Sequence, residues 1–113
     1  MLTISQRQVG SITIVDLNGK ITISEGSAQF REAIRQLVEQ EKPRLVLNFA
    51  GVTYVDSSGV GELVSTYTAI SKQHGQLRLL HVPPRIKELL RITKLLSVFE
   101  LFDDEAAALQ SFR

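Results

Sequence analysis

No cysteine occurs among the 113 residues of the sequence. This absence excludes disulfide bonds, thiolate metal ligands and a cysteine nucleophile, and it fits a cytoplasmic protein. An excess of charge is missing too, because 13 lysines and arginines stand against 12 aspartates and glutamates, a formal net charge of +1. We therefore expect no direct binding to nucleic acid and no attraction to an acidic membrane surface.

Long hydrophobic runs are also absent. The longest unbroken one covers residues 106–109, whereas a membrane-spanning helix needs about 20 apolar residues. The opening letters, MLTISQRQVG, lack the apolar segment of a secretory signal. The remaining composition, 43% apolar and 22% charged, is that of a globular protein. The length predicts one domain, over residues 1–113.

Hydrophobic periodicity predicts the elements. Residues 2–5 and 12–17 alternate apolar and polar side chains, which predicts two strands joined in a hairpin at Val9 and Gly10. Apolar runs predict strands at residues 45–49, 77–82 and 98–102, the first of them central and covered on both faces. Apolar side chains at helical spacing predict helices that include residues 30–38, 60–70, 84–90 and 106–112.

The predicted order is β-β-α-β-α-β-α-β-α. Strands that alternate with helices predict an α/β domain with a mixed, mostly parallel sheet, an N-terminal hairpin and helices packed on the sheet. Candidate N-caps are Ser24 or Ser27 for the first helix and Asp103 for the last one. Pro84 suits the first turn of the third helix.

The stretch TYVDSSGVGEL, residues 53–63, lies between the predicted central strand and the second helix. In the simplest interpretation Ser57 or Ser58 caps that helix, while Gly59 and Gly61 permit a tight turn. This interpretation explains one serine and leaves the other serine and Asp56 without a role.

Catalytic and cofactor motifs do not fit these letters. A hydrolase elbow needs Gly-x-Ser-x-Gly, but Val55 stands where the first glycine belongs. A triad needs a histidine, and we expect His74 and His81 to be structural. A dinucleotide fingerprint would need glycine at Val64, and neither a P-loop nor a histidine pair with metal-binding spacing occurs. We therefore expect no enzymatic activity, no cofactor and no metal.

A serine exposed at a helix N-terminus can instead be modified by another protein. Phosphate there would meet backbone N–H groups and the positive end of the helix. It would also add about −1.5 to −2 charges beside Asp56, enough to change what docks on that surface.

The string Asp56-Ser57-Ser58-Gly59-Val60-Gly61 after an apolar strand resembles the signature of STAS-domain anti-sigma factor antagonists. The resemblance extends over the chain, through residues 46–49, 75–77 and 89–93. It implies partner switching, in which the unmodified protein binds an anti-sigma factor that is also a serine kinase. The kinase phosphorylates Ser57, which ends binding, and a PPM-type serine phosphatase restores it.

The resemblance further implies that Asp56, Ser58, Gly59, Val60 and Gly61 form the loop that meets the partner. The family often has Gly-x-Leu-Asp near the end of the second strand, and here the stretch is Gly19-Lys20-Ile21-Thr22. Thr22 thus takes the place of an acid near the phosphorylation site, and we include it in the candidate partner-binding loop.

Two alternatives remain open. One keeps the fold but makes the protein a non-phosphorylated STAS binding subunit of a transport or other regulatory complex, which the presence of Ser57 disfavours. The other is a small hydrolase that uses Ser57, which the missing histidine partner disfavours.

Two helix faces are further candidates for contact. Lys87, Arg91 and Lys94 form either a solvated face or a rim for acidic groups on the kinase. The small residues at 61, 65 and 69 could either admit a partner helix closely or form an ordinary surface.

Overall fold

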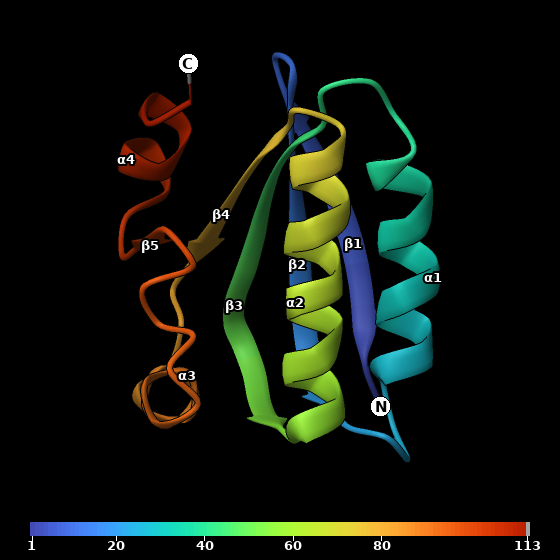
Figure 1. Cartoon of the computed structure of the whole chain (residues 1–113), viewed down its shortest axis with the longest axis vertical. Helices are drawn as coiled ribbons and strands as arrows, with labels where there is room; N and C mark the ends of the chain where they lie inside the picture. The colour runs from blue at the N-terminus through green and yellow to red at the C-terminus, as the bar shows by residue number, and fades with distance from the viewer. Residues whose placement is uncertain (113) are drawn as a thin grey trace.

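A five-stranded mixed sheet forms the frame of the protein in the computed structural model, which describes residues 1–112 (Figure 1). Its strands are β1 (Thr3–Val9), β2 (Ile12–Ile21), β3 (Arg44–Val55), β4 (Gln76–Leu80) and β5 (Leu101–Phe102), and they lie in the sheet in chain order. β1 is antiparallel to β2, and every later pair is parallel. The predicted hairpin and mostly parallel sheet are confirmed.

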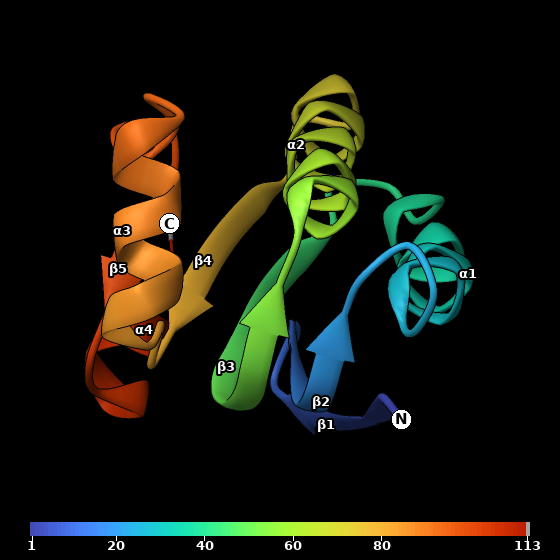
Figure 2. The ribbon, with the colours of Figure 1, turned by 90° about the horizontal axis from the view of Figure 1, so that it is seen from below.

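Four helices connect and follow these strands: α1 (Ser27–Val38), α2 (Ser57–Lys72), α3 (Pro84–Ile92) and α4 (Glu105–Gln110). The predicted order of elements is therefore confirmed. Because successive parallel strands are neighbours and their crossovers share one hand, α1 and α2 lie on the same face of the sheet (Figure 2). α4 lies on the opposite face, where Ala108 packs with Ile14 and Val46.

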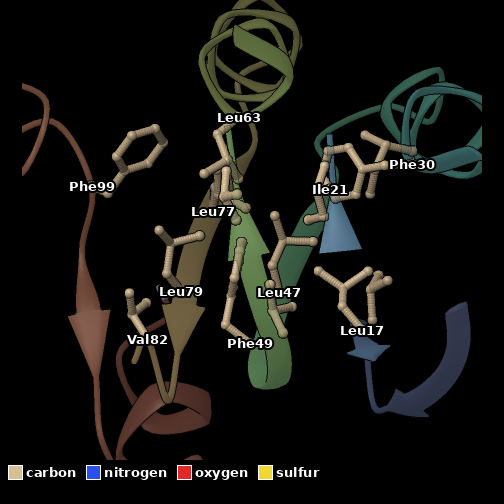
Figure 3. Close-up of a cluster of buried hydrophobic side chains, with 14 of the residues drawn as sticks. Leu17, Ile21, Phe30, Leu47, Phe49, Leu63, Leu77, Leu79, Val82 and Phe99 are labelled. Atoms are coloured by element: carbon tan, nitrogen blue, oxygen red, sulfur yellow. The ribbon is translucent and has the colours of Figure 1, made fainter. Parts of the chain in front are cut away.

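The main core fills the space between the sheet and the helices α1, α2 and α3 (Figure 3). Leu47 and Phe49 of β3 point into it and are fully buried, together with Leu63 of α2. Val46 of β3 points to the other face and is equally buried beside α4. β3 is thus covered on both faces over this stretch, as its continuous apolar run predicts.

β3 is longer than its apolar run predicts. It continues to Val55, and its last residues pair with β2 alone, because β4 ends where Leu80 pairs with Asn48. The β2–β3 ladder has two register shifts within this extension. They accompany the bend of β3 in Figure 1. The extension places residue 56 beyond the end of β4.

Two of the predicted helix caps are wrong. Gly26, with φ 98°, precedes α1 and no side chain caps that helix, because Ser27 is already helical and its hydroxyl contacts α2 instead of its own backbone. Asp104, one residue later than predicted, caps α4 by accepting a hydrogen bond from Ala107 N. Pro84 does occupy the first turn of α3.

Charged side chains hold α4 and the hairpin together. Arg7 of β1 donates to Asp16 of β2 and also to Glu105 of α4. Across β4, Arg78 donates to the backbone oxygen and hydroxyl of Ser111 just after α4. Within residues 1–112, no helix has both the length and the apolar character needed to cross a bilayer.

Candidate functional site at the start of α2

Asp56 caps α2. Its backbone is extended, with φ −100° and ψ −171°, and its Oδ1 accepts hydrogen bonds from Ser58 N (2.9 Å) and Gly59 N (3.1 Å). The interpretation in which Ser57 or Ser58 caps this helix is therefore wrong, and Asp56 has a structural role that sequence reasoning missed. A carboxylate at this position also lies at the favourable end of the helix dipole.

The same carboxylate holds the turn that follows β2. Its Oδ2 accepts a hydrogen bond from Ile23 N at 3.0 Å, while Asp56 N donates to Ile21 O at 3.3 Å. The hydrogen bonds from the Ser58 hydroxyl and from the backbone N–H groups of Ile23, Gly59 and Ser58 stabilise the ionised form, and they lower the pKa of Asp56 to about 2. Asp56 therefore carries a full negative charge at neutral pH.

The hydroxyl of Ser58 makes two hydrogen bonds. Its hydroxyl donates to Asp56 Oδ1 at 2.6 Å and lies 2.7 Å from Ser27 Oγ. Since a hydroxyl has only one hydrogen to donate, Ser27 must donate to Ser58. This chain of hydrogen bonds joins the first turns of α1 and α2.

Ser57 differs from its neighbour. It is the first residue of α2, its side chain is exposed, and its hydroxyl has no hydrogen-bond partner within residues 1–112. The structure thus separates two adjacent serines into one that is held by the fold and one that faces solvent.

The two glycines of the motif have different tasks. A Cβ at Gly59 would lie against the carbonyl oxygen of Ile21 and within 2.6 Å of Val55 Cγ1, so only glycine allows α2 to start this close to β2. Gly61 faces open space. Val60 is buried in the core and anchors the first turn of the helix.

The amides at this helix start are largely occupied. Ser58 N and Gly59 N donate to Asp56, and Val60 N donates to Asp56 O. The expectation that phosphate would meet backbone N–H groups here is therefore wrong for the amides of Ser58, Gly59 and Val60. The side chain of Asp56 already takes the place that an anion would fill.

Thr22 lies inside the neighbouring turn. It is only 9% exposed, and its Oγ1 donates to Glu25 O and accepts from Glu25 N. Its hydroxyl therefore shapes the turn that Asp56 holds through Ile23. Ile23 itself projects into solvent beside the site, and nothing in the local sequence distinguishes it from a core residue.

Neither histidine lies near Ser57. His74 follows the C-terminal end of α2, a helix of 16 residues and so about 24 Å long. His81 follows Leu80, which pairs with Asn48, and the eight residues from there to Asp56 span roughly 25 Å of strand. Within residues 1–112, no group of three His, Asp or Glu side chains could hold a metal ion.

The small residues of α2 face another helix of the same chain. Ser65 and Ala69 line a shallow groove with Ile34 and Val38 of α1. Arg31 of α1 closes one end of the α1–α2 contact through an ion pair with Glu62 (2.6 Å). Gly61 faces open space instead, and contact of this face with a partner helix stays a prediction.

Comparisons with known proteins agree on one family. A family model described as the STAS domain matches residues 3–108. The chain is 27% identical over 111 residues to the anti-sigma F factor antagonist of Paenibacillus polymyxa, and that alignment covers 96% of this chain and 92% of the relative. It is 31% identical over 87 residues to the anti-sigma-B factor antagonist of Bacillus subtilis, and that alignment covers 77% of this chain and 78% of the relative. A crystal structure of an anti-sigma factor antagonist from Mycobacterium paratuberculosis has the same fold, with a TM-score of 0.86 at 24% identity over 100% of this chain and 95% of that one.

Proposed function

The chain belongs to the STAS domain family, and from this premise we propose that it is an anti-sigma factor antagonist whose residues 1–113 act as one domain. In its unmodified form it binds an anti-sigma factor that is also a serine kinase. The kinase phosphorylates Ser57 and the complex dissociates, and a PPM-type serine phosphatase returns the protein to its binding form. The protein itself acts by binding and carries out no catalysis.

The contrast between Ser57 and Ser58 supports this proposal most directly. A kinase needs a hydroxyl that it can reach, and Ser57 is exposed at the rigid start of α2. Ser58 has its hydrogen committed to Asp56 and accepts from Ser27. Phosphate transfer to Ser58 would require both hydrogen bonds to break, whereas transfer to Ser57 requires neither.

The local charge supports a role for phosphate in ending the contact. Asp56 is ionised because its pKa is about 2, and phosphate on the next residue would add about −1.5 to −2 charges. The amides of Ser58 and Gly59 are already bound to Asp56 and cannot compensate that charge. A partner would have to desolvate it, at a cost of about 2–5 kcal/mol for an uncompensated charge in an interface.

Phosphosite mapping with each anti-sigma kinase of the source organism tests this proposal. Wild type, Ser57→Ala and Ser58→Ala are incubated with kinase and ATP, and the modified residues are identified by mass spectrometry. We expect phosphate on Ser57 in wild type and in Ser58→Ala, and none in Ser57→Ala. Full incorporation into Ser57→Ala would show that the assignment is wrong.

Calorimetric titration of the same kinases with Ser57→Asp tests the effect on binding. We expect this variant to melt within a few degrees of wild type, because the side chain is exposed, and to lose the partner. A non-phosphorylated binding subunit of another complex predicts instead that neither wild type nor Ser57→Asp binds these kinases. The titration therefore separates the two functions.

A further inference from the structure

A groove lies between the end of β3 and α3. β4 stops opposite Asn48, so within residues 1–112 the last residues of β3 have no strand on that side, and α3 lies beside them below the end of β4 (Figure 1). The groove has a volume of about 220 Å³, larger than the ~150 Å³ that accommodates a benzene ring in an engineered cavity. Its lining comprises Tyr54, Val55, Arg85, Ile86, Glu88, Leu89 and Ile92.

Large apolar side chains remain exposed along this groove. Ile92 is 60% and Tyr54 is 45% exposed. A single exposed apolar residue is ordinary on a protein surface, but these two residues line the same groove. Val55 in its wall is only two residues ahead of Ser57, so the groove and the candidate phosphorylation site share one end of the molecule.

The groove also has a charged border. Its lining has one cation, Arg85, and one acid, Glu88. The neighbouring residues of α3 and of the turn after it add further cations, so that residues 85–94 carry a net +3, whereas the whole protein has +1. Arg91 pairs with Glu88, but Arg85 has no ion-pair partner within residues 1–112. Two copies of this surface would repel each other, and a surface with acidic groups would be attracted.

We propose that this groove binds a large apolar side chain of the anti-sigma partner, with an acidic side chain of the partner beside it at Arg85. The inference rests on the proposed function and extends the contact from Ser57 across β3 to α3. The apolar insertion supplies affinity, and the basic border speeds the encounter.

The apolar part is tested with Ile92→Ser and its matched control Val9→Ser. Val9 is 41% exposed in the hairpin, at the end of the molecule away from α3 (Figure 1). The probe is the purified anti-sigma kinase that phosphorylates wild type, loaded with ADP so that no transfer occurs. We expect Ile92→Ser to weaken binding by about 10- to 100-fold, as the loss of a buried isoleucine predicts, and Val9→Ser to bind as wild type.

The charged part is tested with Arg85→Glu against Lys72→Glu, which changes the net charge equally at the far end of α2. We expect Arg85→Glu to slow association several-fold at low salt, with the difference shrinking as salt rises. Lys72→Glu should have a much smaller effect. Melting temperatures of all four variants should stay close to that of wild type, because each side chain is exposed.

The outcomes separate the two proposals. If Ser57→Asp abolishes binding while Ile92→Ser binds like Val9→Ser, the groove inference is wrong and the proposed function stands. If wild type binds no anti-sigma kinase, both fail. If wild type self-associates and Ile92→Ser dissociates it, the groove is a contact between copies and the inference is wrong.

Discussion

Four donors converge on the carboxylate of Asp56. They are the backbone N–H groups of Ile23, Ser58 and Gly59 and the hydroxyl of Ser58. Asp56 therefore joins the turn after β2 to the first turn of α2, and its charge is needed to satisfy all of them. An asparagine could keep part of this set, but its amide nitrogen cannot accept a hydrogen bond from Ile23 N.

The pH dependence of unfolding should report this role. The pKa of Asp56 is about 2 in the folded protein, below its ordinary value of 3.8. A depressed folded pKa means that the stabilisation is present above the unfolded pKa and is lost as the pH falls through the folded one. We expect Asp56→Asn to melt several degrees below wild type at pH 6, and the gap to narrow between about pH 5 and pH 2.

Thermal melts at low ionic strength, where exposed charges are least screened, measure this gap. Asp103→Asn is the control, because Asp103 is an exposed carboxylate that does not cap a helix. It should follow the wild-type curve throughout. A constant gap for Asp56→Asn across the range would contradict the proposed charge dependence.

At the scale of the residue, the sequence predicted the accessible serine, Ser57, but not that Asp56 caps α2. Three polar residues in a row can each cap a helix, and the choice depends on which one has extended backbone. Here that residue is Asp56, because β3 continues to Val55 and Asp56 N bonds to Ile21 of the neighbouring strand. The decisive contact is 35 residues away in sequence, so local letters could not identify it.

At the scale of the element, α2 starts closer to the sheet than a side chain would permit. A Cβ at Gly59 would meet Ile21 and Val55, whereas one at Gly61 would meet nothing within 4 Å. We expect Gly59→Ala to lower the free energy of unfolding by about 1–3 kcal/mol through overpacking. Gly61→Ala should raise it by up to about 1 kcal/mol through helix propensity.

Urea denaturation of both variants measures these opposite changes, with each glycine as the matched control of the other. Equal effects would mean that the close approach at Gly59 has no energetic consequence.

The sequence predicted every element of the fold but not every boundary. Apolar letters reveal a strand where it is buried, as in the first half of β2, and fail where a strand is exposed on both faces, as in most of β1. The end of β3 is mixed in character because β2 is its only partner there. The α3 groove arises from that same unequal strand length, which no local pattern encodes.

At the scale of the whole molecule, the end that carries Ser57 and the α4 end are separate. Arg78 is buried at the α4 end, donates to Ser111 and to Leu77 O, and stacks on Phe112 with its guanidinium carbon 4.8 Å from the ring centroid. Its partner on β3, Val46, lies ten residues ahead of Asp56. We therefore expect a substitution at one end to leave the contacts at the other end unchanged.

Arg78→Lys tests this separation. Lysine cannot reproduce the forked set of donors, and we expect a loss of about 1–3 kcal/mol in the free energy of unfolding. The rate of Ser57 phosphorylation below the melting transition should not change. Arg35→Lys is the control, since Arg35 makes an exposed ion pair with Glu32 and such pairs contribute little. A slowed phosphorylation in Arg78→Lys would show that the two ends are coupled.

The order of the strands has a consequence for how the chain is made. Each strand pairs with the one synthesised just before it, and the parallel pairing of β2 with β3 joins residues only 32 to 34 positions apart. Short sequence separations favour rapid folding, and no strand has to wait for one encoded much later. We therefore expect the sheet to grow strand by strand as the ribosome releases it. α4 follows all five strands in the chain, so its docking through Arg78 comes after the turn that Asp56 holds is in place.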